Sequence, residues 1–190
     1  FINIVIVNAA KISRTYYAGQ YDPENPSAPA CWSPDTKAPD PSVPSETRQA
    51  SKCMDCPQNI KGSGQGESRA CRFSQRIAVA LEGQMDTVYQ FQLPATSIFG
   101  DAKDGKMGMQ AYAKYLRAHK TPSIAVVTQV YFDESSATPK LYFKAVRPLT
   151  EEELQEAVKL KDTDEAIRAI TTTVAQTDKV QKEAPPLAED

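Results

Sequence analysis

The chain has 190 residues, of which 41% are hydrophobic and 24% are charged. This composition is typical of a soluble globular protein with one domain carrying an insertion or tail, or with two small domains. The longest apolar runs, residues 77–81 and 124–127, are far too short to cross a bilayer, so a membrane-spanning chain is excluded and no membrane partner is expected.

The net charge of −2 argues by itself against a polyanionic partner, but its distribution does not. Residues 1–148 carry 17 Lys and Arg against 13 Asp and Glu, whereas residues 149–190 carry 5 against 11. A basic body followed by an acidic tail is typical of proteins that contact nucleic acid, although many chains have solvated charge runs. Charge alone leaves both interpretations open.

Alternation of apolar and polar residues predicts five strands. They cover residues 1–12, 72–81, 87–95, 122–133 and 140–149. Residues 107–120 place apolar side chains at helical spacing before Pro122 and predict a helix. Thr150 with Glu153, and Asp162 with Glu165, predict capped starts of two short acidic helices within residues 150–172. Residues 173–190 are expected to form an acidic disordered tail.

Five strands with a helix between the third and the fourth have the chain order of a five-stranded OB-fold barrel, a mainly β (α+β) fold. A mixed α+β sheet with one covering helix has the same order, so both arrangements stay open at this point. A doubly wound parallel sheet is excluded because strands and helices do not alternate. The predicted domain spans residues 1–149 and holds a cysteine-rich insertion at about 28–75, after the first strand.

All four cysteines of the chain lie in this insertion. Their spacing is C-x21-C-x2-C-x14-C, and the residues between them are too polar and too rich in proline to fold by apolar burial. A structural zinc ion bound by four thiolates would supply the missing stability, and clustered cysteines favour a reducing, cytoplasmic compartment. A redox CxxC is the alternative, although no βαβ unit surrounds it. The predicted ligands are Cys31, Cys53, Cys56 and Cys71.

Basic and aromatic residues within and beside the insertion are candidates for nucleic-acid contact. Arginine and lysine suit phosphate groups, and exposed aromatic rings can stack on bases. The alternative for each aromatic residue is a place in the core. The candidates are Arg14, Lys52, Lys61, Arg69, Arg72 and Arg76 among the cations, and Tyr16, Tyr17, Trp32 and Phe73 among the aromatic residues.

Catalytic patterns find little support in the sequence. The only histidine, His119, has no obvious carboxylate partner, so a Ser/His/Asp arrangement is not indicated. The glycine-rich residues 61–66 have their lysine before the glycines, which is the wrong order for a phosphate-binding loop, and they are expected to form a turn. We therefore expect a protein that is not an enzyme.

The string from Cys53 to Leu81, CMDCPQNIKGSGQGESRACRFSQRIAVAL, resembles the cysteine-rich segment of a group of bacteriophage single-stranded DNA-binding proteins. The resemblance implies an OB-fold that protects single strands during replication or recombination, in the host cytoplasm. It implies zinc-ligand roles for the four cysteines and backbone contacts for Arg69, Arg72 and Arg76. It also implies that the acidic C-terminal segment recruits replication proteins. The long, proline-rich interval between Cys31 and Cys53 departs from the pattern and leaves Cys31 the least secure ligand.

Two other functions compete with sequence-nonspecific single-strand binding. One is a zinc-stapled interaction or structural subunit of a phage replication, transcription or virion assembly, with no nucleic-acid affinity of its own. The other is an enzyme of nucleic-acid metabolism, for which turnover would depend on the metal. The sequence does not distinguish DNA from RNA, since nothing in it is specific for a 2′-hydroxyl group.

Overall fold

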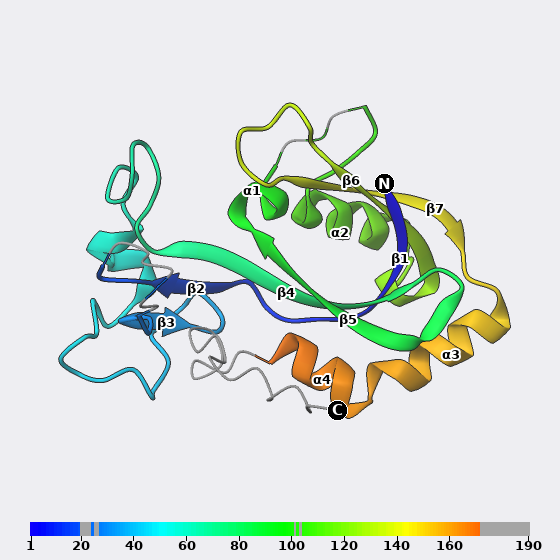
Figure 1. The fold of residues 1–190 in the computed structure, drawn as a ribbon, viewed down its shortest axis with the longest axis horizontal. Coiled ribbons are helices and arrows are strands. Elements are labelled where there is room, and N and C mark those ends of the chain that lie inside the picture. Colours follow the sequence, from blue (N-terminus) through cyan, green and yellow to red (C-terminus); the bar gives the residue numbers. More distant parts are fainter. Residues whose placement is uncertain (20–23, 25–26, 101, 103, 172–190) are drawn as a thin grey trace, which may run out of the picture. The chain divides into compact units, whose positions relative to one another are not determined.

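The computed structural model describes residues 1–19, 24, 27–100, 102 and 104–171. The protein is mainly β, with an open antiparallel sheet of seven strands and a few short helices (Figure 1). The strands are β1 (Ile2–Ala9), β2 (Ser13–Tyr16), β3 (Cys31–Ser33), β4 (Arg72–Leu81), β5 (Gln84–Pro94), β6 (Val126–Phe132) and β7 (Leu141–Pro148). The α-helices are α1 (Ala95–Ile98), α2 (Met109–Ala118), α3 (Glu151–Lys161) and α4 (Asp164–Ile170). Three 3-10 turns, η1 (Cys53–Asp55), η2 (Pro57–Asn59) and η3 (Ser123–Ala125), complete the described elements.

The strand order is β3-β2-β4-β1-β6-β7, and β5 pairs with β4. The chain divides into two compact units. Unit 1 consists of Phe1–Arg14 and Arg72–Thr171, and the described part of unit 2 lies within Thr15–Cys71. The predicted tail at 173–190 lies outside the described residues.

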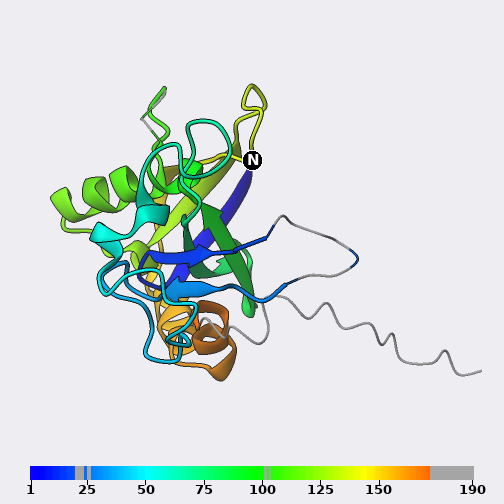
Figure 2. The same ribbon diagram turned by 90° about the vertical axis from the view of Figure 1, so that its left-hand side faces the viewer.

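Unit 1 has three layers, and its sheet is the middle one. On one face, Ile4 and Ile6 of β1 and Ile77 of β4 pack with Tyr112 and Leu116 of α2. The opposite face meets α3 and α4 (Figures 1 and 2). Because both faces are covered, β1 buries four consecutive residues instead of alternate ones.

The two faces of the sheet carry side chains of different size. The face toward α2 buries large residues, among them Tyr112, Phe143 and Ile98. The face toward α3 and α4 is built largely of small ones. Its buried members are Val5, Val7, Ala78, Ala80, Ala157, Ala166 and Ala169.

The hairpin of β4 and β5 is the longest antiparallel pair, and its register runs from Ser74 opposite Pro94 to Leu81 opposite Gln84. Gly83 has a φ of +81° in the connecting turn, a backbone conformation that side chains with a Cβ rarely adopt. The strand predicted over residues 72–81 is confirmed as β4, with the same bounds.

Helix α3 begins at a complete capping box, as predicted from the sequence. The Thr150 hydroxyl accepts a hydrogen bond from the Glu153 backbone N–H, and the Glu153 carboxylate accepts one from the Thr150 N–H. Arg147 at the end of β7 donates to the same carboxylate and to Glu82. The hydrogen bond from Arg147 is the main cause that lowers the pKa of Glu153 to about 2.

A closed barrel of five strands is not shown by this structure, and OB-type closure stays a prediction. The strands of unit 1 form an open sheet whose second face is covered by α3 and α4. Three short elements, β2, β3 and α1, are not among the predicted ones, and they have only four, three and four residues respectively. Such short elements leave too few residues for a recognisable period.

Candidate nucleic-acid interface and metal site

The four cysteines all belong to unit 2, and each has a relative exposure of 8%. None of them forms a disulfide in the described structure. Cys31 lies on β3, Cys53 is the first residue of the short turn η1, and Cys56 directly follows that turn. Four buried, reduced thiols in a unit with little regular structure are the donor chemistry that a structural zinc ion prefers.

Backbone hydrogen bonds fix the chain at the cysteines. The Cys53 N–H donates to the Lys37 carbonyl at 2.9 Å, and the Cys71 N–H donates to the Gln58 carbonyl at 2.9 Å. Asn59 joins the two cysteines of the CxxC motif, because its backbone N–H donates to the Cys56 carbonyl and its side-chain amide donates to the Cys53 carbonyl. Hydrogen bonds within unit 2 therefore hold the backbone at three of the four cysteines.

The arrangement of side chains does not by itself display a metal site. Within the described residues, no three or more His, Cys, Asp or Glu side chains are grouped so that they could hold a metal ion. The chemistry of the four thiols fits zinc, but their placement in this structure does not form a completed ligand set. Zinc ligation by the four cysteines therefore stays a prediction.

The glycine-rich segment between the third and fourth cysteines forms a tight hydrogen-bonded turn. The N–H groups of Gly62 and Gly64 both donate to the Ser68 carbonyl, at 2.9 and 3.0 Å. A Cβ on Gly64 would lie 2.6 Å from the Ser68 hydroxyl and 2.9 Å from the Arg69 carbonyl carbon. Gly64 is thus needed because the chain approaches itself closely at this position. The backbone N–H groups of Gly62 and Gly64 already have a hydrogen-bond partner.

Four of the predicted cations are exposed. Lys52, Lys61 and Arg69 belong to unit 2, and Arg72 is the first residue of β4 in unit 1. Lys61 forms a surface ion pair with Glu67, a type of contact that contributes little to stability. No ion pair is found for Lys52, Arg69 or Arg72 among the described residues. These three side chains are available to an anion.

Two other predicted contacts are buried or half-buried in unit 1. Arg14 has a relative exposure of 7%, and its guanidinium carbon lies 3.9 Å from the centre of the Phe73 ring. Phe73 also meets the edge of Phe99, at 5.0 Å between ring centres. Arg14 and Phe73 therefore cover each other in this structure, and their contact with nucleic acid stays a prediction.

Arg76 is partly buried and donates from Nη1 to the Thr171 carbonyl at 2.6 Å. This contact anchors the end of α4 to the sheet and competes with phosphate binding. Of the predicted stacking residues in unit 2, Tyr17 is exposed, and Tyr16 and Trp32 are half-buried. Tyr17 is thus the most accessible ring of the predicted set.

A cationic surface on α2 is missing from the sequence analysis. Lys114 and Arg117 are exposed on this helix, and Lys120 is exposed just after it. The sequence holds a clear indication of it, since residues 105–132 contain four Lys and Arg and no Asp or Glu.

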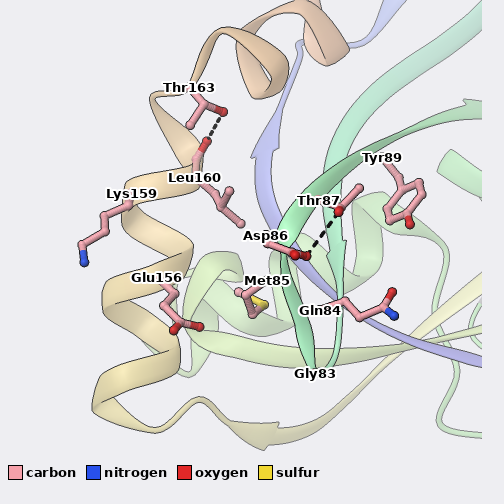
Figure 3. A pocket seen from close by; sticks show the side chains of 10 residues that line it. All are labelled: Gly83, Gln84, Met85, Asp86, Thr87, Tyr89, Glu156, Lys159, Leu160 and Thr163. Atoms are coloured by element: carbon pink, nitrogen blue, oxygen red, sulfur yellow. Dashed lines mark hydrogen bonds between the residues drawn. The ribbon is translucent and has the colours of Figure 1, made fainter.

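An open hollow of unit 1 lies between the start of β5 and α3, and its volume is about 720 Å³ (Figure 3). Met85 and Leu160 give it apolar walls, and Asp86, Glu156 and Lys159 are the charged residues of its lining. Two carboxylates against one ammonium group disfavour phosphate. The charge of this lining is therefore unfavourable for a phosphate backbone.

No known protein family, curated protein or solved structure matches this chain. Function must therefore be argued from the residues themselves. Among the described helices, none has the length and apolar character needed to cross a bilayer.

Proposed function

We propose that the chain is a single-stranded DNA-binding protein that coats and protects single strands during phage DNA replication or recombination, without sequence preference and without catalysis. Zinc on the four cysteines would be structural in this proposal. The acidic C-terminal segment would recruit replication proteins. Strands β1, β4, β5, β6 and β7, with α2 between β5 and β6, keep the chain order that an OB-type fold requires.

The observation that carries the proposal is the exposure of Arg69 and Arg72 on either side of the buried Cys71. Within unit 2, the Cys71 N–H donates to the Gln58 carbonyl, which holds the chain that follows Arg69. Guanidinium groups donate two parallel hydrogen bonds to a phosphate and remain charged at every physiological pH. Neither arginine has a carboxylate partner in the described structure.

The expected mode of binding is contact with the phosphate backbone, assisted by stacking of bases on exposed rings such as Tyr17. Each phosphate contact releases counterions, so the affinity should fall steeply as salt rises. Because neither phosphate contact nor stacking distinguishes one base from another, sequence preference should be weak.

Fluorescence anisotropy with labelled oligo-dT and with a duplex of equal length, each at low and high salt, tests the proposal. We expect tight, salt-sensitive binding with preference for the single strand. The double variant Arg69→Gln with Arg72→Gln should weaken binding at least tenfold, as loss of two charge-assisted contacts implies. Lys159→Gln with Lys161→Gln removes the same charge from α3 and is the matched control.

The second candidate function is an interaction module, and one observation favours it. Exposed carboxylates cover the outer surface of α3 and α4, and they outnumber the three cations there. They are Glu151, Glu152, Glu156, Asp162, Asp164 and Glu165. If the protein binds neither single strand nor duplex, single-strand binding is refuted and a docking role for this acidic surface becomes the better account.

A further inference from the structure

We infer that the outer surface of α2 is a contact surface for the backbone of a single-stranded nucleic acid, in addition to the predicted contacts around the cysteines. We name Lys114, Tyr115, Arg117, His119 and Lys120 the α2 surface. The inference rests on the proposed function, and it assigns part of the binding to residues that the resemblance does not include.

The first argument is the sign of the charge. Lys114, Arg117 and Lys120 are exposed, and no ion pair is found for any of them within the described part of the chain. Residues 105–132 contain no Asp or Glu, so the nearest carboxylates in the sequence are Asp104 and Asp133. Cations that have no internal partner produce a positive surface potential, which attracts a polyanion.

The second argument is the layering of unit 1. Its sheet separates α2 from α3 and α4, as the two views of the fold show (Figures 1 and 2). Residues 150–171 carry seven Asp and Glu against three Lys and Arg. One outer layer of the unit is therefore basic and the other acidic. A nucleic-acid strand is attracted to the basic layer and repelled by the acidic one.

The third argument is local geometry. Lys114 and Arg117 are three residues apart on the helix and so share one side of it. Beside them, the ring of Tyr115 packs against that of His119 with 4.3 Å between ring centres, and Tyr115 remains 40% exposed. The His119 Nδ1 lies 2.9 Å from the Tyr115 carbonyl, which fixes the pair. A partly exposed ring beside cations can stack on a base while the cations bind the neighbouring phosphate groups.

The fourth argument is a shallow hollow of about 380 Å³ at the end of α2. Arg117 and Lys120 line it together with Thr121 and Ser123. No carboxylate contributes to its lining, in contrast to the larger hollow beside α3. The Thr121 hydroxyl donates to the His119 carbonyl, so the two cations and the Ser123 hydroxyl are the donors that this hollow offers to a phosphate group.

A triple variant tests the inference on the full chain. Lys114→Gln with Arg117→Gln and Lys120→Gln removes three positive charges from the α2 surface. The control, Lys159→Gln with Lys161→Gln and Arg168→Gln, removes three from the acidic layer. Arg117 is the residue of the α2 triple that lies in the last turn of a helix, whereas all three control residues do, and cations there offset the helix dipole. The control should therefore cost folding at least as much as the α2 triple. Circular dichroism should show that both variants are folded.

The readout is the affinity for labelled oligo-dT at several salt concentrations. We expect the α2 triple variant to bind at least tenfold more weakly, and its slope of log affinity against log salt to be shallower by about 2, since each single-strand phosphate contact contributes about 0.7. The control should change the affinity much less, because salt screens surface charges that lie away from the contact. Tyr115→Leu, which keeps all charges, should weaken binding about fivefold or more, the lower limit for loss of one stacked base.

The inference and the proposed function fail in different ways. If the wild type binds oligo-dT and the α2 triple variant binds equally well, or if both triple variants weaken equally, the α2 surface is not a contact and the proposed function stands. If the wild type does not bind single strands at all, the proposed function itself is refuted and the inference falls with it.

Discussion

The hydroxyl pair of Tyr112 and Thr128 holds α2 on the sheet, and its removal gives a measurable loss of stability. Tyr112 lies on α2 and Thr128 on β6, and neither side chain is exposed. Their oxygens are 2.7 Å apart. Tyr112→Phe keeps the ring and its stacking on Phe143, where the ring centres are 6.1 Å apart, so it removes the hydroxyl alone. The Thr128 hydroxyl then has lost its buried partner.

We expect Tyr112→Phe to lower the free energy of unfolding by about 1–3 kcal/mol, the cost of an unsatisfied buried hydroxyl group. For a chain of this size, each kcal/mol corresponds to a fall in Tm of about 2–4 °C. Urea denaturation followed by far-UV circular dichroism measures the change, and an unchanged m-value would show that both proteins unfold to the same extent.

A double-mutant cycle with Thr128→Val separates the hydrogen bond from other effects. The double variant has no unsatisfied hydroxyl at this site, so its loss should be smaller than the sum of the two single losses by about 1 kcal/mol or more. Additive losses, or a Tyr112→Phe loss below about 0.5 kcal/mol, which is the level of ordinary surface substitutions, would refute the reasoning. Burial also raises the pKa of Tyr112. The contribution of neutral Tyr112 to the stability of the fold is therefore complete below pH 10 and is lost as the pH rises further. Tyr112→Phe should not show this loss of stability at alkaline pH.

Three further predictions concern other parts of the molecule. Thr150→Ala removes the N-cap of α3 and should cost about 1 kcal/mol in urea denaturation, whereas Thr150→Ser should be nearly neutral. Arg147 lowers the pKa of Glu153 from 4.5 to about 2, so their ion pair stabilises the fold fully above pH 4.5 and progressively less as the pH falls to 2. The Tm of Glu153→Gln should therefore depend less on pH in that window. A variant whose Tm depends on pH as strongly as that of the wild type would contradict a stabilising role for this ion pair. Mass spectrometry of the native protein should find about one zinc ion per chain, as a four-thiolate site requires. Cys71→Ser or a chelator should remove the zinc ion and lower the Tm. A metal-free protein of unchanged Tm would exclude structural zinc.

The elements of unit 1 in which apolar residues recur at a regular spacing could be predicted from the sequence. In β4 the residues Ile77 and Val79 face one layer while Ala78 and Ala80 face the other, so the run reads as a strand buried on both sides. Helix α2 was equally clear, because Met109, Tyr112 and Leu116 recur at helical spacing. Their pairing partners could not be predicted, since contacts between distant segments leave no period within either segment.

The candidate site was less accessible to prediction, because exposure depends on tertiary contacts. The sequence presents Arg14 and Arg72 as similar basic residues, yet Arg14 is buried against Phe73 and Arg72 is exposed. Arg76 donates to Thr171, which lies 95 positions later in the chain. The cysteines could be grouped from their spacing, but the positions of their thiols depend on the irregular backbone of unit 2.

The small side chains beneath α3 and α4 have a consequence for local unfolding. A buried alanine removes much less apolar surface from water than the isoleucine, tyrosine and phenylalanine residues beneath α2. The free energy needed to detach α3 and α4 from the sheet should therefore be smaller than that needed to detach α2. In native-state hydrogen exchange, amides of α3 and α4 should exchange through such partial opening while those of α2 exchange only on global unfolding. The two outer layers of unit 1 would then differ in how readily they detach from the sheet as well as in charge.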